Sequence, residues 1–116
     1  DADASMELAR YQQTVLRALE DTGNALVRFE RAHDADVELE RAALDSARAA
    51  RLARLRYEAG ETGLLDVLDA ERAQLEAEDA FAAGRTRTAT GAVAVYRAMA
   101  GGWPQTLPAR ETAGVR

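Results

Sequence analysis

The chain has 116 residues and a formal net charge of −5; 47% of its residues are apolar but only 5% are aromatic. Its length fits a single domain, and a composition rich in alanine, leucine, glutamate and arginine favours long helices or coiled coils over a sheet. Acids and arginines alternate throughout, and no basic cluster stands apart from acidic neighbours. This pattern argues against nucleic-acid binding.

Neither a transmembrane helix nor a signal peptide is visible in the sequence. It has no run of 18 apolar residues, which a transmembrane helix would need, and no leader resembling a signal peptide. Zero cysteines exclude disulfides and thiol chemistry. Because the chain begins with Asp1 rather than methionine, we expect an upstream segment to have been removed.

The first predicted element is one long helix over about residues 2–58. From about Leu8 to Glu58 there is no proline and only one glycine, Gly23. Apolar or small residues recur in steps of three, four and seven, at Leu8, Tyr11, Val15, Leu19, Thr22, Leu26, Phe29, Val37, Leu44 and Ala47. A helix of about 50 residues, from Leu8 to Glu58, would be roughly 75 Å long. The eight-residue step from Phe29 to Val37 departs from strict heptads and predicts local unwinding of a supercoil.

A break marked by glycine follows over residues 59–63. We expect Gly60 to form a left-handed helix C-cap and the Thr62 hydroxyl to cap the next helix. That second helix is predicted over about residues 64–100. Residues at intervals of seven mark one face of it: Leu68, Leu75, Ala82, Ala89 and Tyr96. Two glycines and Pro104 end it, so we expect a hairpin domain over 1–103 and a disordered tail over 104–116.

The charges support an antiparallel hairpin. Folding the chain at about residue 61 places residue i opposite a residue near 122 minus i. Arginines then face acids in two sets: Arg48, Arg51, Arg54 and Arg56 face Asp66, Asp69, Glu71 and Glu76, and Asp34, Asp36 and Glu38 face Arg85 and Arg87. Exposed pairs contribute only about 0–1 kcal/mol each, so the pattern indicates register and orientation more than stability.

The first twenty or so residues have no partner in this register. They nevertheless carry an apolar stripe, formed by Leu8, Tyr11, Val15, Leu16 and Leu19. An exposed apolar stripe normally marks a missing partner. We therefore expect the chain to be a fragment, a subunit of an oligomer, or both.

No catalytic constellation is visible. His33 has no second histidine or cysteine to form a zinc site with, and we interpret it as a solvated surface residue. The glycines lack the spacing of a phosphate-binding loop, and the aromatic residues are interpreted as packing residues. We expect no enzyme activity, no metal and no cofactor.

Two carboxylates follow the break closely. Asp66 and Asp69 are three residues apart, so on a helix they share one face, with no Lys or Arg between them. One interpretation is that they are solvated acids, with Asp66 complementing the helix dipole. The other is an ion or gate site. If copies assemble around an axis, the tips would form a ring of carboxylates that raise one another's pKa and attract cations.

Several segments together resemble the outer-membrane factor family, the TolC and OprM type of trimeric tunnel found in tripartite efflux pumps and type I secretion systems. These segments are ARYQQTVLRALEDTGNAL, RLRYEAG, GLLDVLDAERAQLEAEDAF and ATGAVAVYRAMAGGW. The most specific features are DVLDA, which follows a Tyr-x-x-Gly motif, and the closing GGW.

The resemblance implies an all-α fold, a long antiparallel two-helix coiled-coil hairpin that forms part of a trimeric helical barrel. It implies the last periplasmic hairpin of an outer-membrane channel in a Gram-negative bacterium, acting as a passive conduit. It further implies a homotrimer that meets a periplasmic adaptor protein and an inner-membrane pump, without nucleic acid as a partner.

Site residues are also carried over from the resemblance. Tyr57 matches a gate tyrosine, and Asp66 and Asp69 match aspartates that line the constriction. The turn residues Ala59, Gly60, Glu61 and Thr62 match the region that meets the adaptor. Related tips carry an arginine where this chain has Thr62, so the charged latch is absent here.

A rival hypothesis stays open at the level of sequence. The chain could be a structural coiled-coil interaction module, or the hairpin of an adaptor protein, with the acids on a solvated face. An adaptor hairpin would be expected to carry flanking lipoyl-like β segments, and none is visible in this sequence, although truncation of the chain weakens that objection.

Overall fold

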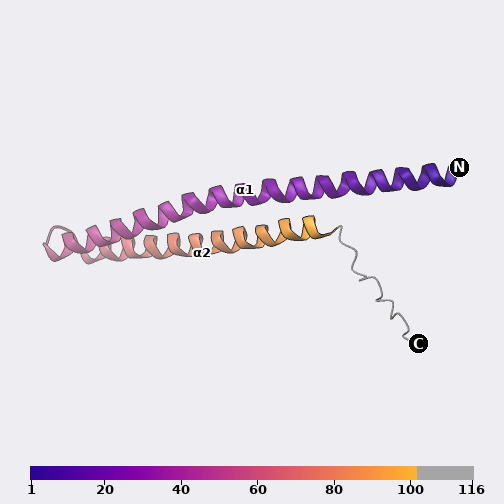
Figure 1. The fold of residues 1–116 in the computed structure, drawn as a ribbon. Coiled ribbons are helices and arrows are strands. Elements are labelled where there is room, and N and C mark those ends of the chain that lie inside the picture. The colour runs from indigo at the N-terminus through magenta and orange to yellow at the C-terminus, as the bar shows by residue number, and fades with distance from the viewer. Residues whose placement is uncertain (102–116) are drawn as a thin grey trace, which may run out of the picture.

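Two long helices joined by a short turn make up the part of the chain that the structure describes, residues 1–101 of a computed structural model. Helix α1 spans Ala2–Glu58 and α2 spans Leu64–Ala100. The helices run antiparallel and lie against each other, and the turn forms one end of the hairpin (Figure 1). The all-α hairpin expected from the sequence is confirmed. The predicted tail over 104–116 lies outside the described residues.

A seam of buried and half-buried residues holds the two helices together. On α1 the seam consists of Thr22, Ala25, Phe29, Ala32, Asp36, Leu39, Ala43, Ser46, Ala47, Ala50 and Ala53. On α2 it consists of Val67, Ala70, Glu71, Gln74, Ala77, Phe81, Gly84, Thr88, Gly91, Ala92, Val95 and Ala98. Steps of three and four alternate along both helices, which is the heptad repeat of a coiled coil.

This seam corrects two expectations. The predicted heptad on α2, which begins Leu68 and Leu75, is exposed and lies beside the seam rather than in it. On α1 the repeat continues from Phe29 to Asp36 without interruption, so the eight-residue step to Val37 causes no break. The repeats expected from the sequence combined residues from two neighbouring faces of each helix, because both faces carry apolar residues.

Helix α1 continues well beyond the end of α2 (Figure 1). Every residue from 1 to 21 is exposed, and the seam begins at Thr22. Tyr11, Leu16 and Leu19 are each at least 64% exposed. The apolar stripe therefore has no partner within residues 1–101, as the charge register predicted.

Candidate functional site

The turn between the helices begins with a Schellman motif. Gly60 has a φ of +75°, the left-handed conformation that glycine adopts at little cost. The Gly60 amide donates to the Tyr57 carbonyl at 2.9 Å, and the Glu61 amide donates to the Arg56 carbonyl at 2.8 Å. These two bonds satisfy carbonyls that the end of α1 would otherwise leave free. The predicted left-handed cap at Gly60 is confirmed.

An ion pair closes this turn. The Arg56 Nε lies 3.4 Å from Glu61 Oε2, at the two positions that often make an apolar contact in Schellman motifs. Arg56 was expected to face an acid on α2, and it pairs within the turn instead. Both side chains are more than half exposed, so the pair contributes little to stability.

The predicted cap of α2 is wrong. Its N-cap is Gly63, in an extended conformation and without a capping side chain, which leaves Thr62 one position outside the helix. The Thr62 Oγ1 is buried and has no hydrogen-bond partner among the described residues. The segment between the helices spans residues 59–63, so Gly63 rather than Thr62 directly precedes Leu64, the first residue of α2.

A shallow groove of about 240 Å³ lies beside this threonine. Alanine and leucine side chains of α1 form its apolar part, and Arg56, Thr62 and Asp66 supply its polar groups. The residues lining it are Ala49, Leu52, Ala53, Arg56, Thr62 and Asp66. The structure thus brings Asp66 and Thr62 together, two of the residues predicted to form the site.

The acidic pair lies on the exposed surface of α2. Asp66 is in the first turn of the helix, where its charge complements the helix dipole, and Asp69 follows on the same side. Neither aspartate forms an ion pair among the described residues. The same residues contain no group of three or more His, Cys, Asp or Glu side chains that could hold a metal ion. Tyr57 is 43% exposed, and no side-chain hydrogen bond forms at it within this part of the chain.

One ion pair crosses the seam near the tip, between Arg54 and Glu71. The hydrogen bond and the negative charge of Glu71 raise the pKa of Arg54 above its ordinary value. This contact agrees with the predicted register. The other predicted cross-pairs are not formed between the described residues: Arg48 pairs with Asp45 of its own helix, and Arg85 lies over the Phe81 ring at 5.8 Å.

Within residues 1–101, no helix combines the length and apolar character needed to span a membrane. His33 is exposed and stacks on Phe29, with 6.3 Å between ring centroids.

The sequence analysis missed the contact of two α2 glycines, Gly84 and Gly91, with α1. Their spacing of seven residues could have indicated it, because glycine within a helix often marks a close approach.

Comparisons with known proteins identify the hairpin. The chain is 31% identical to outer membrane protein OprJ of Pseudomonas aeruginosa over 105 residues, which is 90% of this chain and 22% of the relative. It is 34% identical to the pyoverdine export outer membrane protein OpmQ of Pseudomonas putida, over 94% of this chain and 24% of the relative. No protein-family model matches the chain.

A solved structure has the same fold. The outer-membrane channel OprN is 45% identical, with a TM-score of 0.70 over 88% of this chain and 23% of that one. The chain therefore spans less than a quarter of the length of each of these proteins. Sequence and fold together show that the chain is a helical hairpin of the outer-membrane factor family.

Proposed function

We propose that the hairpin forms part of the wall of a passive outer-membrane conduit, in a tripartite efflux pump or a type I secretion system. The observation that carries the proposal is the 45% identity to the channel OprN, which extends over 88% of this chain. The proposed location is the periplasmic part of an outer-membrane protein. No catalytic step is assigned to it.

A second apolar face supports a wall of several helices. Leu68, Leu75 and Tyr96 of α2 are 52%, 62% and 72% exposed, and they lie at heptad spacing beside the seam. On α1, Val37 and Leu44 are likewise about half exposed. Each helix thus packs on one neighbour and offers a further apolar face to another. A trimeric barrel of helices would cover these faces.

The tip is the proposed gate and docking region. Asp66 and Asp69 are exposed and lack ion-pair partners in this part of the chain, so three tips could assemble them into a ring that attracts cations. The turn from Ala59 to Thr62 is proposed to contact a periplasmic adaptor protein, which would link the conduit to an inner-membrane pump. Tyr57 is proposed to hold the closed state.

A hairpin exchange tests the conduit proposal. Residues 24–98 of this chain would replace the matching hairpin of OprJ, and single-channel conductance would be measured in planar bilayers. We expect trimers that conduct. The control is OprJ carrying the OprN hairpin. If that control conducts and the chimera with this chain forms no channel, the proposal is wrong.

The acidic ring is tested in the same chimera. Asp66→Asn with Asp69→Asn removes the charge at nearly constant shape, and it is expected to weaken cation selectivity and block by divalent cations. Asp79→Asn, at an exposed position further along α2, is the matched control and should leave both unchanged. Equal selectivity and block in all three proteins would exclude a role for the ring.

A further inference from the structure

Two carboxylates lie in the seam between the helices. Asp36 of α1 and Glu71 of α2 are the ionisable members of the seam among the described residues, and both are half-buried. The other members of the seam are apolar or uncharged. Removing a charge from water without giving it a partner is costly, whereas burying an alanine is not. The two carboxylates therefore favour an arrangement of the helices that places positive charge beside each of them.

Each carboxylate faces an arginine of the other helix. Glu71 forms the ion pair with Arg54, and its side chain is 34% exposed. A Cβ at Gly84 would lie 3.2 Å from Asp36 Oδ1 and 3.7 Å from Arg87 Nη2, so the second carboxylate and guanidinium are neighbours across the seam, although they are not in ion-pair contact. The Asp36 Oδ1 is buried and has no hydrogen-bond partner among the described residues, and Arg87 supplies positive charge beside it.

The two facing pairs have opposite polarity. Near the turn the arginine belongs to α1 and the acid to α2, whereas farther from the turn the acid belongs to α1 and the arginine to α2. Asp36 and Arg54 are about 27 Å apart along α1, at a rise of 1.5 Å per residue. Sliding one helix along the other would separate both pairs at once.

The shape of the apolar seam distinguishes poorly between registers that differ by one heptad. Gly84 and Gly91 are seven residues apart, and they lie against Leu39 and Phe29 of α1. After a slip of one heptad in either direction, each of these two large side chains would again face a glycine or an alanine of α2. Steric fit alone therefore leaves neighbouring registers open.

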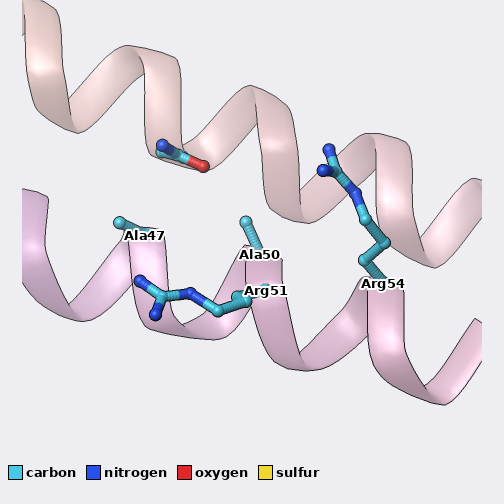
Figure 2. Close-up of a pocket in the computed structure, with 5 residues that line it drawn as sticks. Ala47, Ala50, Arg51 and Arg54 are labelled. Atoms are coloured by element: carbon cyan, nitrogen blue, oxygen red, sulfur yellow. The ribbon is translucent and has the colours of Figure 1, made fainter.

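Alanines line the α1 side of the seam nearer the turn. Figure 2 shows two of them, Ala47 and Ala50, beside a gap of about 180 Å³ that Gln74 of α2 also lines. In the same view, the Arg54 side chain extends from α1 toward α2. A slip of one heptad exchanges Ala43 with Ala50 and changes the packing little, but it moves Arg54 away from its acid.

The charges, in contrast, distinguish these registers. A slip of one heptad places Asp36 opposite an alanine in either direction, Ala80 or Ala94. It places Glu71 opposite Ala47 in one direction and opposite a second acid, in the turn, in the other. Both carboxylates thus lose the facing arginine in every register that differs by one heptad.

We propose that Asp36 and Glu71 determine the register in which α1 and α2 pair, by excluding pairings that leave either carboxylate without a facing arginine. A polar residue in an apolar coiled-coil seam can fix register at a cost in stability. The native pairing gains little from pairs that are partly exposed, so the effect lies in destabilising the alternatives. The proposal concerns the pairing of two helices and does not depend on the conduit function.

Disulfide cross-linking reports the register directly, because the chain has no cysteine of its own. A Cβ at position 91 would lie 3.9 Å from the Phe29 Cβ, a separation that a disulfide spans. Phe29→Cys with Gly91→Cys therefore reports the native register. Phe29→Cys with Gly84→Cys and Phe29→Cys with Ala98→Cys report the two slips of one heptad. A flexible insertion of glycine and serine after Gly60 prevents the turn from imposing a register, so that the seam alone decides.

In the chain with this insertion, we expect intramolecular cross-links in the native register only. Asp36→Ala with Glu71→Ala should raise the ratio of slipped to native cross-links about tenfold or more, because the cost of an unpaired, partly buried charge is removed. Asp34→Ala with Asp79→Ala changes two exposed acids outside the seam and should leave the ratio unchanged. Equal ratios in the two double variants, or slipped cross-links as abundant as native ones in the parent, would overturn the proposal.

A charge exchange tests whether Asp36 and Arg87 face each other in solution. Asp36→Arg and Arg87→Asp each place like charges across the seam, so each should raise the ratio of unfolded to folded chain. The two together restore opposite charges and should recover much of the loss. Asp36→Arg with Arg85→Asp is the control, because Arg85 lies over the Phe81 ring, and it should show no recovery.

Single variants that fail to fold also decide the question. Recovery of helical circular dichroism in Asp36→Arg with Arg87→Asp then supports the facing pair. A double variant no more folded than Asp36→Arg, or equal recovery with Arg85→Asp, overturns it. All variants are compared at one protein concentration, so that association affects them equally.

Discussion

The turn can be tested at a single backbone angle. Gly60 has a φ of +75°, and no residue other than its two chain neighbours has an atom within 4 Å of where its Cβ would be. Gly60→Ala therefore meets no steric obstacle from neighbouring residues. Its effect on stability comes from the left-handed backbone conformation that alanine must adopt there.

Two opposing terms set the magnitude. The left-handed conformation costs an L-residue about 1–2 kcal/mol. Replacing glycine also restricts the unfolded chain, which stabilises the fold by about 0.4–1 kcal/mol. We expect Gly60→Ala to lower the free energy of unfolding by about 1 kcal/mol. Gly60→Asn should lower it less, because asparagine tolerates this conformation better.

Gly23 is the matched control. It lies inside α1 with open space around it and no positive φ, so Gly23→Ala should raise the free energy of unfolding by about 1 kcal/mol. Urea denaturation followed by circular dichroism at 222 nm measures both variants. If the two substitutions change stability in the same direction, the assigned turn conformation does not control the fold in solution.

Three further predictions concern the exposed stripe, the turn and the seam. Leu16→Gln with Leu19→Gln should lower self-association measured by sedimentation, because both leucines belong to the exposed stripe, whereas the control Arg17→Gln should not. A wild-type chain that sediments as a folded monomer would contradict the prediction that the stripe needs a partner. Thr62→Val should raise the free energy of unfolding by up to about 1 kcal/mol, because the buried hydroxyl lacks a partner, and a loss of stability would contradict this. Glu71→Gln should lower stability slightly at low salt and not at high salt; an equal loss at both would show that the ion pair is not the cause.

Several features of the fold follow from local rules. The absence of proline before Pro104 and the good helix formers predict two long helices. Gly60 predicts the left-handed end of α1, since only glycine adopts that conformation freely. The charge pattern predicts the antiparallel register, and the Arg54–Glu71 pair agrees with it. These properties depend on residues close in sequence or on a single fold-back, so periodicity and charge suffice to find them.

The choice of packing face could not be found in the same way. Each helix has two faces that carry apolar residues, and periodicity marks both. The structure buries the face that carries Ala25, Ala43, Ala50 and Val67, and it leaves most leucines of the other face exposed. The cap of α2 is a similar case. Threonine and glycine both occur at N-caps, so residue type does not decide between Thr62 and Gly63. The backbone conformation of the turn places Gly63 at the N-cap.

For the candidate site, the sequence by itself determined that Asp66 and Asp69 follow a turn and share one side of a helix, because a spacing of three residues dictates this. The tertiary structure decided their surroundings. It brings Asp66 beside Arg56 and Thr62 in one groove, and it leaves Leu68 and Leu75 of α2 exposed. The physical reason is that helical periodicity specifies which residues share a face, whereas close packing between helices decides which face is buried.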